Sequence, residues 1–302
     1  MARTGTLDQQ GIEASIAALD VGLFRAVSSQ TKKGDRASLL ALQGACAERF
    51  GTFDYLEIGS HLGGSLQAFV RDARVTGIVS IDLRPEATPD ERGKDIPYIG
   101  NSTQRMLDNL AALPEGDTAK IHTIDADTRT LTPADVSLRP QLCFIDGEHT
   151  NESCLADARF CRSVLADRGV IAFHDTGLIF PAINAFLAEL RADGLKPIAY
   201  PLPDVVFAIE LGGPEIYRTR AMRTLVTGER NQLPPLAALL ARRPAGPALT
   251  SRQLERYWLS GLGSGRRLLD RRMSKLFKSR RRRLAKSARR RVRRARKRVP
   301  FV

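Results

Sequence analysis

The sequence predicts an α/β protein built on a mostly parallel sheet with helices on both faces. Short apolar runs alternate with amphipathic stretches between residues 54 and 192, and this alternation is typical of a parallel sheet covered by helices. The first apolar run ends in a glycine-rich turn, which is where sheets of this kind bind ligands. Two further apolar runs follow so closely that they predict an antiparallel hairpin at the end of the domain.

Residues 8–50 precede the alternation and are predicted to be helical, because apolar residues recur there at helical spacing. Five apolar runs too short for helices are the predicted parallel strands: residues 55–58, 78–81, 121–124, 142–145 and 170–173. The predicted helices between and after them lie near residues 65–73, 102–112, 151–166 and 178–192. The predicted hairpin pairs residues 198–200 with residues 205–211, because so short a connection cannot contain a crossover helix.

Charge separates the chain into a mildly acidic body and a basic tail. The whole chain of 302 residues has a net charge of +14. Residues 265–302 hold 19 Lys and Arg against one acid, which leaves 28 basic and 32 acidic residues in the body. The two parts are therefore interpreted separately. We predict four segments: an N-terminal helical segment (1–50), a ligand-binding α/β domain (51–213), a helical extension (214–262) and a basic tail (263–302) that is disordered or helical.

The glycine-rich turn contains residues suited to a cationic nucleoside. The first predicted strand ends in Glu57 and Gly59, and the turn continues to Gly63 and Ser65. Glycine lets the backbone turn tightly and approach a ligand, and Ser65 is predicted to cap the next helix. Asp82 ends the following strand, where a carboxylate can accept both hydroxyls of a ribose. Glu57 would repel a pyrophosphate but attract a sulfonium and an ammonium, so the turn favours S-adenosylmethionine (SAM) over a nicotinamide dinucleotide.

Two later stretches complete a recognisable pattern. They read Phe-Ile-Asp-Gly-Glu-His at 144–149 and Gly-Val-Ile-Ala-Phe-His-Asp at 169–175. With the glycine turn, they resemble the class I SAM-dependent methyltransferases, in particular the branch with an IDGxH…HD pattern found among bacterial small-molecule and sugar O-methyltransferases. The resemblance covers about residues 54–211. It differs from the commoner ExGxGxG turn, because residues 60–62 separate the glycines here.

The resemblance implies a Rossmann-like, doubly wound sheet and a set of cofactor contacts. Glu57 and Gly59 would lie beside the methionine part of SAM, with Gly63 and Ser65 in the same turn. Asp82 would hold the ribose. Asp127, which follows the third predicted parallel strand, would lie near the adenine.

Four polar residues follow two neighbouring strands and are expected to meet at the same edge of the sheet. They are Asp146, His149, His174 and Asp175. A histidine can take the proton of an attacking hydroxyl, and His149 matches a general base proposed for some sugar O-methyltransferases. A divalent cation such as Mg²⁺ could activate the hydroxyl instead. Asp146 matches a metal-binding aspartate of related enzymes, and Asp175 with His174 matches an acidic pair in which His174 replaces the more usual Asp. Both roles remain open.

The basic tail predicts a polyanionic partner. Residues 266–298 permit a helix of about 50 Å with a narrow apolar stripe, and either an anionic membrane surface or a nucleic acid would attract it. The chain contains no apolar run long enough to cross a membrane and no recognisable secretory signal. We expect a cytoplasmic protein, peripheral at the inner membrane surface if the tail binds lipid.

The leading hypothesis is a SAM-dependent methyltransferase that modifies an oxygen of a small molecule, such as a sugar or glycan precursor. The first alternative is an RNA methyltransferase that captures its substrate with residues 266–298. The second is a binding protein that keeps the fold without catalysis and acts through its tail. The sequence determines neither the acceptor nor the oligomeric state.

Overall fold

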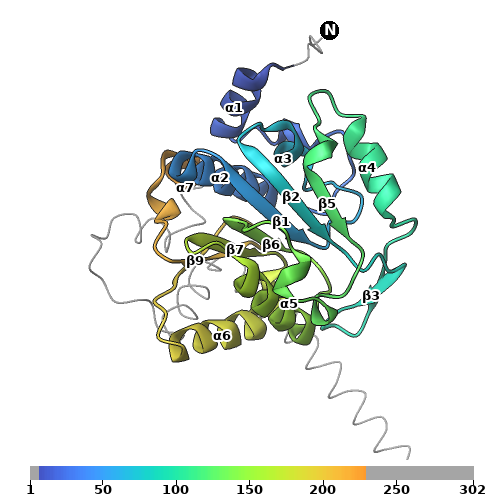
Figure 1. Cartoon of the computed structure of the whole chain (residues 1–302), viewed down its shortest axis with the longest axis vertical. Coiled ribbons are helices and arrows are strands. Elements are labelled where there is room, and N and C mark those ends of the chain that lie inside the picture. The colour runs from blue at the N-terminus through green and yellow to red at the C-terminus, as the bar shows by residue number, and fades with distance from the viewer. Residues whose placement is uncertain (1–6, 229–302) are drawn as a thin grey trace, which may run out of the picture. The chain divides into compact units, whose positions relative to one another are not determined.

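The computed structural model describes residues 7–228, which form one α/β domain (Figure 1). All of them belong to the first of the two compact units of the chain, Met1–Glu255. The predicted helical extension beyond residue 228, and the basic tail at 263–302, lie outside the described residues. No helix in residues 7–228 is long and apolar enough to span a membrane.

Seven strands form the central sheet in the order β5-β2-β1-β6-β7-β9-β8. The strands β5, β2, β1, β6 and β7 are parallel, whereas β9 is antiparallel to both β7 and β8. Their bounds are β1 Phe53–Ile58, β2 Val75–Ile81, β5 Ile121–Ile124, β6 Leu142–Ile145, β7 Gly169–Phe173, β8 Ile198–Pro201 and β9 Phe207–Leu211. The mostly parallel sheet with an antiparallel hairpin at its end is confirmed.

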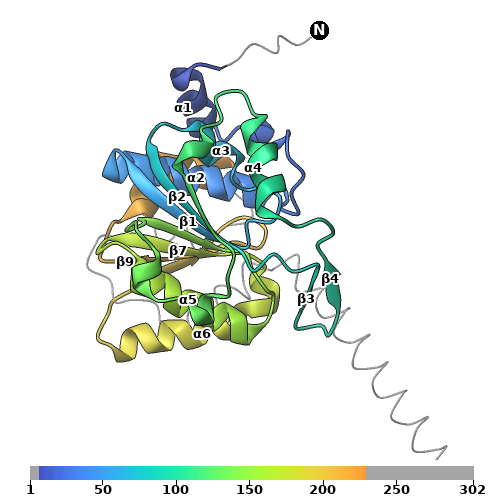
Figure 2. The same ribbon diagram turned by 45° about the vertical axis from the view of Figure 1, so that its right-hand side comes forward.

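Helices cover both faces of the sheet (Figures 1 and 2). Their bounds are α1 Gln9–Ala17, α2 Lys33–Phe50, α3 Gln67–Arg71, α4 Thr103–Ala111, α5 Asn151–Val164, α6 Thr176–Ala192 and α7 Arg220–Gly228. Short 3₁₀ helices join them: η1 Val21–Phe24, η2 Thr118–Lys120, η3 Thr128–Thr130, η4 Pro133–Asp135 and η5 Ile216–Arg218. Residues of α1 to α4 and α7 belong to one apolar core, and residues of α5 and α6 to a second core on the opposite face.

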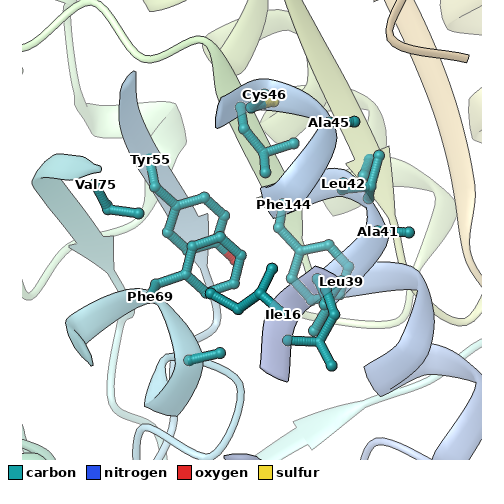
Figure 3. Close-up of a cluster of buried hydrophobic side chains, with 14 of the residues drawn as sticks. Ile16, Leu39, Ala41, Leu42, Ala45, Cys46, Tyr55, Phe69, Val75 and Phe144 are labelled. Carbon is teal, nitrogen blue, oxygen red and sulfur yellow. The ribbon is translucent and has the colours of Figure 1, made fainter. Parts of the chain in front are cut away.

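Strand β1 contributes apolar side chains to both cores, because its successive residues face opposite sides of the sheet. Tyr55 faces the α2 side, where its ring stacks on Phe69 with centroids 3.9 Å apart (Figure 3). Leu56 and Ile58 face the α5 side. Side chains of a strand alternate between faces, so a strand buried on both faces appears in the sequence as a continuous apolar run.

The structure corrects the prediction of continuous helix over residues 8–50. Helix α1 ends at Ala17 and α2 begins only at Lys33. Between them the Gln67 side chain accepts hydrogen bonds from the backbone of Ala26 and Val27, at 2.9 Å each. Because a side chain from α3 satisfies these two donors, Ala26 and Val27 need no helical hydrogen bonds, and only the short helix η1 forms in this segment.

A second sheet was not predicted. Strands β3, Ala87–Pro89, and β4, Asp95–Pro97, form a short antiparallel hairpin that stands apart from the main sheet (Figure 2). Its strands are largely exposed, and each contains a proline, so they lack the apolar alternation that marks a strand in the sequence. The turn of this hairpin packs on the backbone of His149, to which Glu91 N–H donates a hydrogen bond of 3.1 Å.

Candidate active site

Two adjoining cavities open at the carboxyl ends of the parallel strands. The first cavity runs from Asp82 to Asp127 and Asp157. The second cavity contains the polar cluster predicted from the sequence and is lined by Asp35, Ser65, Arg92, His149, His174 and Asp175, among others. Both cavities share the lining residues Gly59, His61, Tyr98 and Asp146. A ligand in the first cavity therefore reaches the edge of the second at Gly59 and Asp146.

The turn after β1 is held against the end of β6. Gly59 has φ of +87°, and a Cβ added there would lie 2.2 Å from the carbonyl oxygen of Asp146. Gly59 N–H donates to Ile81 O at 2.8 Å, and Asp146 N–H donates to Ile58 O at 2.9 Å. Gly63 also has a positive φ, of +83°. Glycine is therefore required at position 59 both by the backbone conformation and by the close approach of the Asp146 backbone.

Glu57 is buried behind this turn and lines neither cavity. Its Oε2 accepts a hydrogen bond of 2.7 Å from the Tyr55 hydroxyl, and its Oε1 accepts one from the Ser65 hydroxyl. The prediction that Ser65 caps a helix is wrong. Residue Leu66 precedes α3 without a side-chain cap, and the Ser65 hydroxyl bonds to the buried carboxyl group instead. Ser65 itself lines the second cavity.

Burial makes the Glu57 carboxyl group a determinant of the pH dependence of stability. Removal from water raises its pKa to about 8, more than the Ser65 and Tyr55 hydrogen bonds lower it. Because the pKa is raised on folding, Glu57 favours the folded state most below its unfolded pKa, and this contribution is lost as the pH rises through the folded pKa.

We therefore expect the free energy of unfolding to fall between pH 5.5 and pH 8.5 less steeply in Glu57→Gln than in the original chain. Glutamine stays neutral and can still bond to both hydroxyls. A pKa that rises by one on folding changes the free energy of unfolding by about 1.4 kcal/mol. Urea unfolding at the two pH values measures the difference, and equal pH dependence in both proteins would contradict the assignment.

Asp82 lines the first cavity, as predicted for a ribose-binding carboxylate. Its Oδ2 accepts from the backbone N–H of His61 and its Oδ1 from that of Arg84, both at 2.8 Å. The Arg84 guanidinium lies 3.3 Å from Asp82 Oδ2 and donates to His61 O at 2.6 Å. These contacts tie the glycine turn to the end of β2. Arg84 was not predicted from the sequence. Its role depends on its own backbone φ of +57°, which no local sequence pattern indicates.

Asp127 also lines the first cavity, together with its neighbours Ala126 and Thr128. Its carboxylate caps η3 and is paired with Arg129, whose guanidinium nitrogen Nε lies 3.0 Å away. The hydrogen bond from Arg129 lowers the pKa of Asp127. Asp127 therefore remains ionised at the cavity wall, with part of its hydrogen-bonding capacity already used.

The polar cluster in the second cavity comes together as expected. His149 Nε2 lies 3.0 Å from Asp175 Oδ2 and 3.8 Å from Asp146 Oδ1. Burial lowers the pKa of His149, but the interactions with Asp146 and Asp175 outweigh it, so the pKa is raised above the ordinary value. The charge of His174 and the contact with His149 overcome the effect of burial on Asp146 and lower its pKa to about 2. The site therefore pairs ionised carboxylates with basic imidazoles.

His174 lies deeper, between carboxylates from three parts of the chain. Its Nδ1 is 2.8 Å from Asp146 Oδ1 and 3.4 Å from Asp175 Oδ2, while its Nε2 is 3.2 Å from Asp35 Oδ2. Burial lowers the pKa of His174, but the charge of Asp146 and the contacts with Asp146, Asp175 and Asp35 raise it well above its ordinary value. The structure thus places a cationic imidazole among three carboxylates.

Asp35 is a site residue that the sequence reasoning did not identify. It lies in the first turn of α2, fully buried, and its Oδ1 accepts a hydrogen bond of 3.1 Å from Val205 N–H in the loop between β8 and β9. Nothing in the spacing of residues links Asp35 to His174, because they are far apart in the chain. Only the packing of α2 against the sheet brings them together.

A divalent cation fits part of this cluster. Among the described residues, Asp146, His149 and Asp175 offer ligand atoms that all lie within 4.8 Å of one another, and carboxylate oxygens suit Mg²⁺. His174, predicted as a ligand, does not belong to this group. The donor set that fits a cation is therefore Asp146, Asp175 and His149, without His174.

Comparison with known proteins shows what the middle of this chain is similar to. Residues 56–176 match a family model described as a methyltransferase domain. No curated protein matches the sequence significantly. The chain therefore contains a methyltransferase-like domain, and its sheet order is that of a Rossmann-like fold.

Solved structures of methyltransferases match this chain at low sequence identity. The O-methyltransferase NovP has a TM-score of 0.52 and 11% identity, over 68% of this chain and 99% of that one. The calicheamicin methyltransferase CalS11 has a TM-score of 0.45 and 15% identity, over 70% of this chain and 100% of that one. The chain thus covers the whole of these smaller proteins, and the comparison with NovP supports the fold.

Proposed function

We propose that this methyltransferase transfers the methyl group of SAM to a hydroxyl oxygen of a small molecule such as a sugar or glycan precursor. The observation that carries the proposal is the junction of the two cavities at Gly59 and Asp146. SAM would fill the first cavity with its ribose on Asp82 and its adenine toward Ala126 and Asp127. Its methyl group would then face the second cavity, where the acceptor would meet His149.

The chemistry assigned to the second cavity is an in-line displacement. The acceptor oxygen forms a bond to the methyl carbon as the carbon–sulfur bond breaks, and S-adenosylhomocysteine leaves. The hydroxyl proton goes to the ring nitrogen of His149 that does not face Asp175. A general base of this kind contributes by removing the proton as the nucleophile attacks. Asp175, 3.0 Å from Nε2, would stabilise the imidazolium that forms.

Glu57 would support the cofactor from behind the turn. It was expected to touch the methionine part of SAM, but its burial supports an indirect role through Ser65. Gly59 and Ser65 would supply the backbone and hydroxyl groups nearest to the ligand, whereas Gly63, expected in the same role, lines neither cavity and faces Leu110 and Met106. The attraction of the site for the sulfonium would come mainly from Asp146, which lines both cavities.

A divalent cation is the second candidate for activating the acceptor. Asp146, Asp175 and His149 would hold it, and when bound it would lower the pKa of the acceptor hydroxyl. His149 cannot serve as the base while its Nε2 ligates a metal, so the two roles exclude each other. The cationic imidazole of His174 lies beside Asp146 and Asp175, where it would repel a divalent cation. We therefore favour His149 as the base over activation by a metal.

Removal of metal distinguishes a site in which His149 is the base from one in which a divalent cation activates the acceptor. With His149 as the base, we expect EDTA to lower turnover by less than about tenfold, because the proton acceptor belongs to the protein. A larger loss that added Mg²⁺ reverses, together with measurable Mg²⁺ binding that Asp175→Asn abolishes, would assign the cluster to a cation instead.

The acceptor class is tested by product analysis. The purified chain is incubated with methyl-labelled SAM and pooled glycan precursors, RNA or lipids, and we expect label on hydroxyl groups of the small molecules. A chain shortened after Gly261 should keep this activity, since the two cavities lie within residues 7–228. Transfer to RNA alone, lost on truncation, would support the RNA methyltransferase alternative. Absence of heat on titration with SAM would support a protein without catalysis.

The basic tail would add a polyanionic partner to this enzyme. We propose that residues 266–298 attract an anionic surface, either an inner membrane leaflet or a nucleic acid, on the basis of their charge alone. A cytoplasmic enzyme with this tail would be peripheral at the membrane in the first case.

A further inference from the structure

Two segments away from the strand ends form a wall of the second cavity. One is residues 28–32, between η1 and α2, and the other is the β3–β4 hairpin with its turn. Most of the side chains that these segments contribute are polar or basic: Ser28, Ser29, Gln30, Lys32, Arg92 and Ile96. If the acceptor hydroxyl lies at His149, the rest of the acceptor contacts this wall.

The segment 28–32 is fixed against the glycine-rich turn and against α2. A Cβ added to Gly64 would lie 2.5 Å from the carbonyl oxygen of Ser28, so this close approach requires a glycine. The backbone N–H of Lys32 donates to Asp35 Oδ2 at 2.8 Å. The same oxygen lies 3.2 Å from His174 Nε2. The backbone of Lys32 therefore has a fixed position relative to the polar cluster.

The turn of the β3–β4 hairpin is fixed to His149 in a similar way. Asp90 forms a β-bridge with His149 and is 4% exposed. Its two carboxylate oxygens accept hydrogen bonds of 2.7 Å from the backbone N–H and from Nε of Arg92. Nη2 of Arg92 also contacts Asp90, whereas no hydrogen bond or ion pair joins Nη1 to any of residues 7–228. Arg92 is therefore held at the cavity with a donor nitrogen available to a ligand.

The charges of the second cavity are balanced at its buried end but not at its exposed end. Each of its three carboxylates lies within 3.2 Å of an imidazole nitrogen. Lys32 and Arg92 are exposed, whereas Asp35 is buried. Within residues 7–228, Nζ of Lys32 has no carboxylate partner. The exposed end of the cavity thus presents positive charge that attracts an anion.

We infer that the acceptor carries an anionic group, a phosphate or a carboxylate, that binds to Lys32 and Arg92 while its hydroxyl lies at His149, an inference that rests on the function proposed above. Lysine and arginine both bind phosphate and carboxylate oxygens through charge-assisted hydrogen bonds. The anionic group lies at the exposed end because the carboxylates at the buried end repel it. The acceptor is therefore a phosphorylated or acidic sugar rather than a neutral one.

The first experiment determines the charge of the acceptor. Pooled glycan precursors are divided by anion exchange into a neutral and an anionic fraction, and each is incubated with the full chain and methyl-labelled SAM. We expect label in the anionic fraction. Treatment of that fraction with phosphatase and nucleotide pyrophosphatase before the incubation abolishes labelling if the group is a phosphate and leaves it intact if the group is a carboxylate.

The outcomes of this experiment distinguish the inference from the proposed function. Equal or greater labelling of the neutral fraction overturns the anionic acceptor and leaves methyl transfer to a small molecule intact. Absence of label from both fractions overturns the proposed function and this inference with it.

The second experiment assigns the binding to Lys32 and Arg92. With the labelled acceptor purified from the anionic fraction, the double variant Lys32→Gln/Arg92→Gln is expected to raise the acceptor KM by about tenfold, because hydrogen bonds to a charged group are lost. The KM for SAM should change little, since neither residue lines the first cavity. The matched variant Lys33→Gln/Lys94→Gln removes two charges from neighbouring exposed positions that line neither cavity. It should leave both KM values unchanged.

Two results of the second experiment overturn the assignment. One is an unchanged acceptor KM in Lys32→Gln/Arg92→Gln, and the other is an equal increase in the matched variant, which would reflect net charge alone. Circular dichroism reports whether each variant folds. If the loss of the Arg92 contact with Asp90 prevents folding, comparison of Lys32→Gln with Lys33→Gln decides, because both lysines are exposed.

Discussion

Replacing His149 with glutamine is expected to lower kcat by about 10²- to 10⁴-fold, the usual contribution of a general base. Glutamine retains a polar side chain beside Asp175 Oδ2, 3.0 Å from the imidazole in this structure, but it cannot take a proton from the acceptor. The affinity for SAM should change little, because His149 lines only the second cavity. Steady-state kinetics with the acceptor and calorimetry with SAM measure the two effects separately.

His122 provides the matched control for this substitution. It is an exposed histidine on β5, outside both cavities, so His122→Gln should leave kcat unchanged. If His149→Gln kept more than about a tenth of the original kcat, the side chain would not act as the base. Loss of SAM affinity in His149→Gln, at unchanged kcat, would indicate a binding role instead.

Replacing Gly59 with alanine is expected to weaken both the fold and the SAM site. Alanine at a φ of +87° costs about 1–3 kcal/mol. The added Cβ also meets the backbone of Asp146 at 2.2 Å, and relief of such a contact costs about 1–3 kcal/mol more. Because Gly59 lines both cavities, any shift of the turn also displaces the SAM-binding surface. Urea unfolding and calorimetry with SAM measure the two losses.

The variant Gly51→Ala distinguishes the cost of a positive φ from the cost of the contact with the Asp146 backbone. It follows α2 with a φ of +76°, and nothing lies within 4 Å of a Cβ added there. Gly51→Ala should therefore show only the conformational cost and leave SAM affinity intact. Equal losses in unfolding free energy for Gly51→Ala and Gly59→Ala would show that the contact with Asp146 is relieved without cost.

The position of Gly59 and Asp82 at the first cavity was predictable because it depends on local sequence. Gly59 and Asp82 follow apolar runs, and the ends of neighbouring parallel strands must meet at one edge of the sheet. The same rule predicts the polar cluster, whose members all follow two neighbouring strands: Asp146, His149, His174 and Asp175. The burial of Glu57 was not predictable, because it depends on hydrogen bonds from the Tyr55 and Ser65 hydroxyls that the strand pattern does not indicate.

The sequence by itself determined the class of fold, the positions of its main strands along the chain and the edge of the sheet that carries the candidate site. Burial on both faces produces continuous apolar runs, and such runs can be read without any distant contact. Tertiary structure alone decided that Asp35 reaches His174, that the β3–β4 hairpin packs on His149, and that Asp157 faces a cavity. These contacts join segments distant in the chain, and their side-chain directions follow from close packing of the whole domain, which no local pattern encodes.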